Sequence, residues 1–288
     1  MDKAIQEERN AGILLVIVLY KIKLEQSLTY LSLIKSKNLS ADTDLLVYDN
    51  SPDATEPDLS DAPAVKITYI ADRNNSGVSR AYNTAARYAL QQKKKWMLLL
   101  DQDTLFPDNA LSLYYDAFKK YPGEKLFAPI MVAGNGKIIS PCYFRFMRGF
   151  SSQNVGIGIN SLSTFSVINC AMCVDVEAFG KNNGYNELIR LDFSDHDFIR
   201  RFKKSNGDRF VVVDFQVSHQ LSTETRTITG NDIVRFDYYL DGAKYMSATT
   251  TEKLLLVINA FLRASKLSLT HRNAAFLGKW FKWVWPNG

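Results

Sequence analysis

The stretch WMLLLDQDTLFP, residues 96–107, runs an apolar segment directly into two aspartates, Asp101 and Asp103. A short apolar run bounded by polar residues indicates a strand buried on both faces, as in parallel sheets. If the strand persists, side chains at i and i+2 point the same way, so both carboxylates project together. Such carboxylates repel unless a cation or donors separate them. A hard divalent ion sharing phosphate oxygens satisfies that need economically.

Three similar segments precede this strand and alternate with helical patterns. The first apolar run, 12–20, ends at Tyr20; the second stops at Asp49, Asn50 and Ser51; and the third stops at Asp72. Helical spacing covers 24–37, about 78–92, and Pro107 through Tyr121. This alternation predicts an α/β domain with a mostly parallel sheet, whose ligands lie beyond the carboxyl ends of the strands. The polar clusters at three strand ends therefore favour a binding cleft, although turns are rich in the same residues.

The pattern changes after residue 121. Short strands are expected over 126–132 and 137–140, around a turn at 133–136. The stretch 144–158, rich in Phe, Arg, Ser and Gly, is typical of a loop, either a mobile acceptor loop or a plain surface loop. From about Asn231 onward the chain reads helical.

A second acidic cluster lies in RLDFSDHDFIRRF, residues 190–202. Ser194 is a candidate N-cap, which places Asp195 and Asp197 in the first turn of a helix. Acidic residues there complement the helix dipole, but this does not readily explain Asp192 as well. A carboxylate near a helix start that faces a cleft is suited to act as a general base.

Histidine and cysteine usage leaves two interpretations open. His219 alone among three histidines follows a strand of the α/β part. A lone His is more often a core or surface residue. As a partner to Asp103, His219 would instead be a borderline metal ligand. Three cysteines in 288 residues indicate a reducing compartment. The CxxC pair Cys170 and Cys173 has apolar flanks, which favours core packing over metal or redox work.

Several motifs occur together in a fixed order: Asp49 at a strand end, NNSGVSRAYN (74–83), LLLDQD (98–103), NCAMCVDVEAFGKNNGYNE (169–187), LDFSDHDFIRR (191–201) and SHQLS (218–222). In this order the chain resembles family 2 glycosyltransferases with the GT-A fold, most closely bacterial rhamnosyltransferases. The resemblance extends over about residues 12–225.

The resemblance implies a role for each matching residue. Asp49 would pair with the base, Asp101 would reach the ribose or a metal-bound water, and Asp195 would take the proton from the acceptor hydroxyl. Asp103 and His219 would hold Mg²⁺ or Mn²⁺ on the diphosphate, with Asp192 and Asp197 in support. The remaining residues of the nucleotide-sugar pocket would be Tyr20, Asn50, Asn75, Gly77, Asn83 and Gln102.

The activity that the resemblance implies is inverting, metal-dependent transfer of a sugar. The donor would be dTDP-rhamnose or a UDP-sugar, and the acceptor a hydroxyl of a bacterial surface polysaccharide or lipid-linked glycan. The expected division is a GT-A catalytic domain over 1–228, with a nucleotide-sugar half (about 12–122) and an acceptor half (about 123–228). A helical appendage would follow over 229–288.

Charge and apolar patterning indicate where the protein works. The N-terminus carries Glu7 and Glu8 where a signal peptide would be basic, and the run 13–20 is too short to span a bilayer, so we expect a cytoplasmic protein. Residues 253–288 contain basic residues and Trp280, Trp283 and Trp285 but no Asp or Glu, which suits the headgroup region of the inner membrane. The same face would otherwise pack on the catalytic domain or on a second subunit of a homo-oligomer.

One other enzyme class shares the local string. DQDT fits the conserved box of haloacid-dehalogenase-like phosphatases. In that class, however, the box lies near the start of the fold, and a later acidic motif follows whose spacing differs from that of GDRFVVVD (207–214). A dinucleotide oxidoreductase is disfavoured because no GxGxxG follows the first strand. No nucleic-acid partner is expected.

Overall fold

The computed structural model describes residues 12–35, 39, 43–58, 65–219 and 231–286. The end of the helix expected over 24–37, the last three residues of the SHQLS motif and the N-terminal ten residues lie outside these ranges. The elements in chain order are β1 (Ile13–Leu19), η1 (Leu24–Gln26), α2 (Leu28–Leu33), β2 (Asp44–Asp49), β3 (Lys66–Ala71), α3 (Val78–Gln91), β4 (Trp96–Asp101), β5 (Thr104–Leu105), α4 (Ala110–Lys120), β6 (Leu126–Ala133), β7 (Ile138–Arg145), β8 (Arg148–Ser152), β9 (Gly158–Ser161), β10 (Met172–Asp175), α5 (Val176–Lys181), α6 (Ser194–Asn206), β11 (Arg209–His219), α7 (Asn231–Met246), α8 (Thr250–His271) and α9 (Ala275–Val284).

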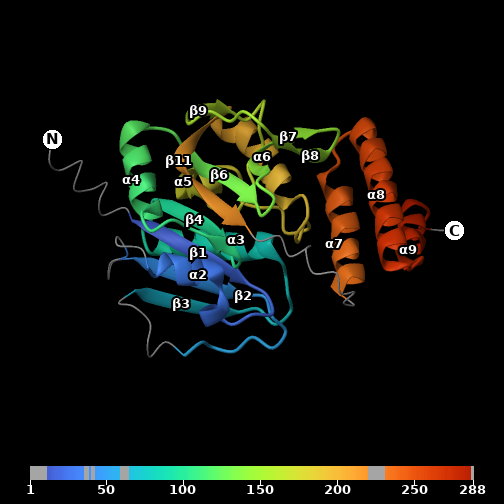
Figure 1. Ribbon diagram of the computed structural model, residues 1–288, viewed down its shortest axis with the longest axis horizontal. Helices are drawn as coiled ribbons and strands as arrows, with labels where there is room; N and C mark the ends of the chain where they lie inside the picture. The colour runs from blue at the N-terminus through green and yellow to red at the C-terminus, as the bar shows by residue number, and fades with distance from the viewer. Residues whose placement is uncertain (1–11, 36–38, 40–42, 59–64, 220–230, 287–288) are drawn as a thin grey trace.

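A central mixed sheet organises these elements in the order β3-β2-β1-β4-β10-β6-β11-β5 (Figure 1). Strands β3, β2, β1 and β4 are parallel, as the strand–helix alternation predicts. Strand β10 then runs antiparallel to both β4 and β6, and β6 pairs in parallel with β11. The parallel prediction is therefore correct for the N-terminal half, and the second half is mixed.

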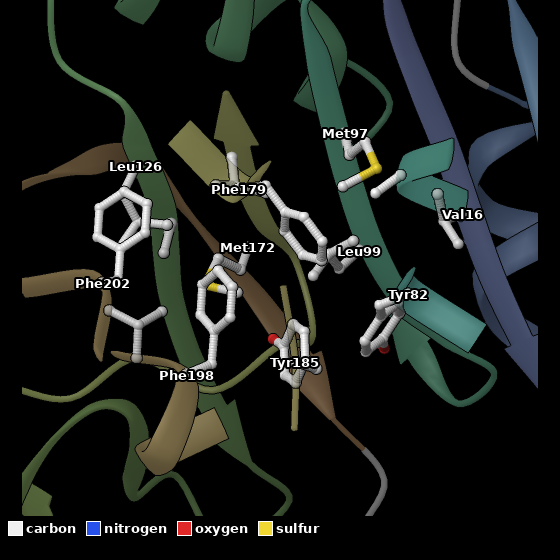
Figure 2. Packing of buried hydrophobic residues seen from close by; sticks show 14 of the residues in the cluster. Val16, Tyr82, Met97, Leu99, Leu126, Met172, Phe179, Tyr185, Phe198 and Phe202 are labelled. Carbon is white, nitrogen blue, oxygen red and sulfur yellow. The ribbon is translucent and has the colours of Figure 1, made fainter. Parts of the chain in front are cut away.

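Both faces of the sheet are covered by helices, because each inner strand is apolar on both sides. On β1, Leu14, Val16 and Val18 join the core beneath α3, α5 and α6, while Ile13, Leu15, Ile17 and Leu19 join the core beneath α2 and α4. Figure 2 shows the first of these cores, in which the rings of Tyr185 and Phe198 stack with centroids 4.4 Å apart. The fold class predicted from the sequence is confirmed.

Two local predictions differ from the structure. The helix expected from Leu24 is broken into η1 and α2, because the Ser27 hydroxyl accepts the Tyr30 N–H and starts a new helix there. The loop expected over 144–158 contains the hairpin of β7 and β8 instead. Its turn residues, Phe146 and Met147, have positive φ values of 52° and 58°. The turn lacks the Gly or Asn that usually signals such a hairpin.

The last three helices form a unit at one end of the molecule, with α7 between the sheet and α8 (Figure 1). Their own core is built from Phe236, Tyr239, Leu240, Ala260, Ala264 and Phe276. A second cluster joins this unit to the part that contains the sheet, because Met147 of the hairpin and Ile189 pack with Ala243, Met246 and Leu256. The prediction of a helical C-terminal segment is confirmed. Across the described residues, no helix has both the length and the hydropathy needed to span a bilayer.

Candidate active site

The strand ends that carry polar clusters meet at one edge of the sheet. Leu19 lies beside Asp49, and Val18 lies beside Asp101, so the ends of β2 and β4 flank the end of β1. His219, the last residue of β11, pairs with Thr104 of β5, directly after the DQD sequence. The topology therefore brings Asp49, Asp101 and Asp103 to the same edge as His219.

A cluster of potential metal ligands forms where β4 ends. Strand β4 stops at Asp101, so the strand does not carry both aspartates in one direction; a turn instead brings an Asp103 carboxylate oxygen to 3.4 Å from Nδ1 of His219. One ligand atom from each of Asp101, Cys170 and His219 lies within 4.8 Å of the others. Buried Thr104 connects the cluster, since its hydroxyl lies 3.0 Å from His219 Nδ1 and 2.7 Å from the Cys170 sulfur.

The electrostatics of this cluster favour a bound cation. Burial raises the pKa of Asp101, and the Asp103 carboxylate raises it further, although His219 acts in the opposite direction. Burial also raises the pKa of Asp103. Carboxylate and imidazole donors suit Mn²⁺ and Mg²⁺, and the charge of a divalent ion would offset the burial that raises the pKa values of both carboxyl groups. The residues present therefore fit a divalent metal ion.

Asp195 lies in the first turn of α6. Burial raises the pKa of Asp195 well above the usual range of a carboxyl group, and the nearby Asp101 carboxylate adds to the effect. Tyr82 and Asn169 together connect the two acidic groups. The Tyr82 hydroxyl donates to an Asp101 oxygen at 3.4 Å and accepts a hydrogen bond from the Asn169 side-chain amide at 3.0 Å, and the backbone N–H of Asn169 donates to Asp195. Tyr82 and Tyr185 contact each other, with ring centroids 5.3 Å apart (Figure 2).

The start of α6 differs from the sequence prediction. Ser194 is the first helical residue, and the N-cap is Phe193 in a left-handed conformation, with φ 73°. The Ser194 hydroxyl donates to the carbonyl of Leu191 instead of capping the helix. A non-glycine residue in this conformation costs free energy and persists only where its surroundings hold it.

Several residues expected in the nucleotide pocket line the edge beyond β1 and β2. Asp49 accepts hydrogen bonds from the Ser51 N–H and from the Tyr69 hydroxyl, at 2.8 and 2.7 Å. Asn50 is buried, and its side-chain oxygen has no hydrogen-bond partner among the described residues. Gln102 accepts the backbone N–H of Tyr20 at 2.7 Å, which fixes the end of β1 against the DQD turn. An unpartnered, buried amide oxygen at a strand end is a direct candidate for ligand contact.

The N-terminal half of α3 holds the segment 185–193, which leads into α6. The carbonyl of Arg190 accepts the Val78 N–H at 2.9 Å, and Ser79 donates to the carbonyl of Ile189. Gly77, at φ 94°, allows this approach, because an added Cβ would lie 2.8 Å from the Cβ of Arg190 and still closer to its carbonyl oxygen.

Asn83 and Asn75 each contribute to the local backbone structure. The Asn83 side-chain amide hydrogen-bonds within the protein: it donates to the Tyr185 carbonyl and the Glu187 carboxylate and accepts the Tyr185 N–H. Asn75 has a left-handed conformation, with φ 49°, in the turn that precedes α3. Asn83 thus fixes the 185–187 backbone, and Asn75 shapes the turn.

The two supporting aspartates have separate environments. Asp197 is buried and accepts hydrogen bonds from Arg201 at 2.8 Å and Arg200 at 3.4 Å. Asp192 accepts a hydrogen bond from Arg263 of α8 at 3.2 Å. Asp197 therefore stabilises α6 internally, whereas Asp192 faces the C-terminal helices.

Sequence reasoning missed four residues that build this site: Tyr82, Asn169, Thr104 and Arg263. Tyr82 and Asn169 lie inside quoted motifs, but a lone tyrosine or asparagine gives no signal of a long-range hydrogen bond. Cys170 was interpreted as a core residue, and its burial agrees with that; its sulfur nonetheless lies beside the metal-ligand cluster.

Comparisons with known proteins agree with this fold. Residues 29–137, less than half of the chain, match the model of Glycosyl transferase family 2. No curated protein matches the sequence. Among solved structures, TarS 1-349 from S. aureus superposes with a TM-score of 0.55 at 14% identity, covering 91% of this chain and 73% of that one.

Two further structures were solved with Mn²⁺. The mannosyltransferase PcManGT from Pyrobaculum calidifontis, in complex with GDP-Man and Mn²⁺, gives a TM-score of 0.52 at 12% identity, over 96% of this chain and 75% of that one. GalNAc-T7, with UDP, GalNAc and Mn²⁺, gives 0.51 at 12% identity, over 85% and 53%. At such identities the likeness establishes the fold, so this chain has the GT-A fold of glycosyltransferases and carries, in residues 29–137, a sequence match to glycosyl transferase family 2.

Proposed function

We propose that this protein is an inverting, metal-dependent glycosyltransferase that uses a nucleoside diphosphate sugar. One observation carries the proposal: the acidic cluster of Asp101, Asp103 and His219 and the buried carboxyl of Asp195 meet at the same sheet edge, joined through Tyr82 and Asn169. In this fold that edge is where ligands bind. The match to the family 2 model supports the reaction class.

Each residue has a chemical task in this proposal. Asp101, Asp103 and His219 hold the metal ion, with Cys170 beside them. When bound, Mg²⁺ or Mn²⁺ neutralises the charge that develops on the departing nucleoside diphosphate. Asp195 accepts the proton of the acceptor hydroxyl, and its raised pKa makes the ionised carboxylate a stronger base than an exposed one. A base on the face opposite the leaving group gives single displacement with inversion.

The donor in this proposal is dTDP-rhamnose or a UDP-sugar. The sequence resemblance to rhamnosyltransferases supports the first, and the structural neighbours solved with UDP, UDP-GlcNAc and GDP-Man support a nucleotide sugar in general. The base would lie near Asp49 and the unpartnered oxygen of Asn50. The acceptor in this proposal is a hydroxyl of a surface polysaccharide or lipid-linked glycan, and we divide the chain into a catalytic domain, 1–228, and a helical segment, 229–288.

The test incubates the protein with Mn²⁺ or Mg²⁺ and a panel of dTDP-, UDP- and GDP-sugars and measures nucleoside diphosphate release. We expect release with one donor class and its loss on addition of EDTA. Release that EDTA leaves unchanged would contradict the metal role. Hydrolysis of simple phosphomonoesters instead would favour the phosphatase alternative, although the DQD box here ends the fourth strand along the chain instead of opening the fold.

The outer face of α8 and α9 suits a membrane surface, which a lipid-linked acceptor would require. Its exposed apolar side chains are spaced along one side of α8 and at the end of α9: Leu254, Ile258, Phe261, Leu262, Leu269, Phe281 and Trp285. Phe261, Trp280 and Trp285 contact one another in sequence, with ring centroids 4.9 and 5.8 Å apart. An exposed aromatic patch of this kind marks an interaction site.

The charge of the same helices supports an anionic bilayer as the proposed partner. Lys253, Lys266, Arg272 and Lys282 are exposed, and 253–288 contains no acidic residue. Each basic residue near an anionic surface contributes about 1 kcal/mol. We therefore place the protein at the cytoplasmic face of the inner membrane, with these helices in the headgroup region.

Vesicle sedimentation tests this contact. We expect binding to vesicles of phosphatidylglycerol and phosphatidylcholine, weaker binding to phosphatidylcholine alone, and loss in Phe281→Ser/Trp285→Ser. Leu90→Ser on α3 is the matched control, since Leu90 is equally exposed but lies on the catalytic half. Equal sedimentation of both variants would contradict the membrane contact. Concentration-dependent dimerisation that the double variant abolishes would show instead that this face binds another protein surface.

A further inference from the structure

The segment 189–193, which precedes α6, is held from the side of the C-terminal helices as well as from α3. Arg263 of α8 donates to the Asp192 carboxylate at 3.2 Å, and the side chains of both residues are mostly buried. The other Asp192 oxygen is buried without a hydrogen-bond partner among the described residues. Arg263 therefore supplies a charge partner that Asp192 needs where water cannot solvate it.

Aromatic packing extends this contact to the start of α6. The Arg263 guanidinium lies over the Tyr239 ring, 4.1 Å from its centroid, and the Tyr239 ring packs against Phe193 at 4.9 Å. Phe193 is the left-handed N-cap of α6, two residues before Asp195. Tyr239 thus lies between the guanidinium and the residue whose conformation needs external support.

The backbone of α7 presses on the same segment. An added Cβ on Gly242 would lie 3.1 Å from a ring carbon of Phe193 and still closer to the carbonyl oxygen of Asp192. The ring of Tyr238, also on α7, lies 5.6 Å from the guanidinium carbon of Arg190. Three kinds of contact, an ion pair, ring packing and close backbone approach, therefore join the C-terminal helices to residues 190–193.

We propose that Arg263 is a positioning residue for sugar transfer: through Asp192, and through Tyr239 and Phe193, it holds the left-handed start of α6 and with it the carboxyl of Asp195. Through these contacts α7 and α8 contribute to catalysis, although they lie outside the sheet-containing part. The inference rests on the proposed role of Asp195 as the base. A misplacement of about 1 Å at a reacting group costs on the order of 100-fold in rate, so this link controls turnover without touching the donor.

The test compares Arg263→Gln with Lys279→Gln. Lys279 forms an ion pair with Asp237 at 2.7 Å, which joins α9 to α7 inside the same helical unit but does not reach residues 190–193. We expect Arg263→Gln to lower kcat by about 10- to 100-fold while the Kd of the nucleotide sugar stays within twofold. We expect Arg263→Lys to recover part of the loss and Lys279→Gln to keep wild-type kcat.

A second readout does not depend on the activity. Hydrogen exchange of the backbone amides of 192–196 should become faster in Arg263→Gln than in Lys279→Gln, with circular dichroism showing that both variants are folded. Equal exchange and equal kcat in the two variants would overturn the proposal. If the wild type releases no nucleoside diphosphate from any donor, the proposed function fails; the exchange comparison alone then decides whether Arg263 orders the start of α6.

Discussion

Gly77→Ala should destabilise the protein strongly, because Gly77 meets two requirements at once. Its backbone, at φ 94° and ψ 172°, lies in a region that is essentially restricted to glycine and costs another residue about 1 to 3 kcal/mol. An added Cβ would also push against the backbone and Cβ of Arg190. Relief of that clash moves Arg190 away and breaks two hydrogen bonds, Val78 N–H to Arg190 and Ser79 to Ile189, each contributing about 0.5 to 1.5 kcal/mol.

The sum is a loss of about 2 to 6 kcal/mol, a large part of the 5 to 15 kcal/mol that stabilises a typical domain. Urea unfolding followed by circular dichroism measures it as a lower midpoint at unchanged slope. Gly136→Ala is the matched control: Gly136 also has a positive φ, 77°, but nothing lies within 4 Å of an added Cβ. We expect the unfolding free energy of that variant to fall only by the cost of the unfavourable backbone conformation, about 1 to 2 kcal/mol. Equal losses in the two variants would refute the argument from the Arg190 contact.

Three other predictions concern the charged groups of the site. Asp195→Asn should abolish transfer, by at least about 100-fold, while the Kd of the donor is unchanged; full activity would remove Asp195 as the base. Asp101→Asn should unfold at a higher urea concentration than the wild type at pH 7 without metal. Burial raises the pKa of Asp101, so the stability of the wild type falls as pH rises through that raised pKa. The amide of the variant does not ionise, so the variant does not lose this stability. A midpoint equal to or below that of the wild type would contradict this. Burial lowers the pKa of His196 from its usual 6.5 to about 4, so its contribution to stability is complete above pH 6.5 and is lost as pH falls toward 4; His196→Gln should flatten the pH dependence of the unfolding free energy in that window, and an unchanged slope would exclude His196 as its source.

The main features of the fold could be predicted from sequence because they depend on local patterns. The apolar runs that end at Tyr20, Asp49 and Asp101 are continuous, so each identifies a strand buried on both faces. Because these strands alternate with helices, they are expected to be parallel, and their carboxyl ends then meet at one edge of the sheet. The hairpin of β7 and β8 escaped prediction, since Phe146 and Met147 adopt left-handed conformations without glycine or asparagine. Their cost is offset by distant contacts, the packing of Met147 against α7 and α8 and the hydrogen bond from Asn259 to the Phe146 carbonyl.

In the candidate site, too, some residues could be predicted from local patterns and others could not. The resemblance implies Asp103 and His219 as metal ligands and Asp101 as a residue that reaches the ribose or a metal-bound water. The structure brings the three together, and their roles remain proposals. Ser194 fits the composition of an N-cap, yet Phe193 takes that position, because α7 and α8 support a conformation that no local rule favours. Tyr82 and Arg263 contribute through partners about 20 and 70 residues away in the chain, a separation at which periodicity carries no information.

Gly77 and Gly242 approach carbonyl oxygens only two residues apart, those of Arg190 and Asp192, from opposite ends of the chain. The path of the intervening backbone is thus set by two residues that have no side chain. A side chain added at either glycine would therefore displace this segment, as the Gly77→Ala prediction expects for Arg190. In a library selected for folded protein, randomisation at 77 or 242 should therefore return mostly glycine.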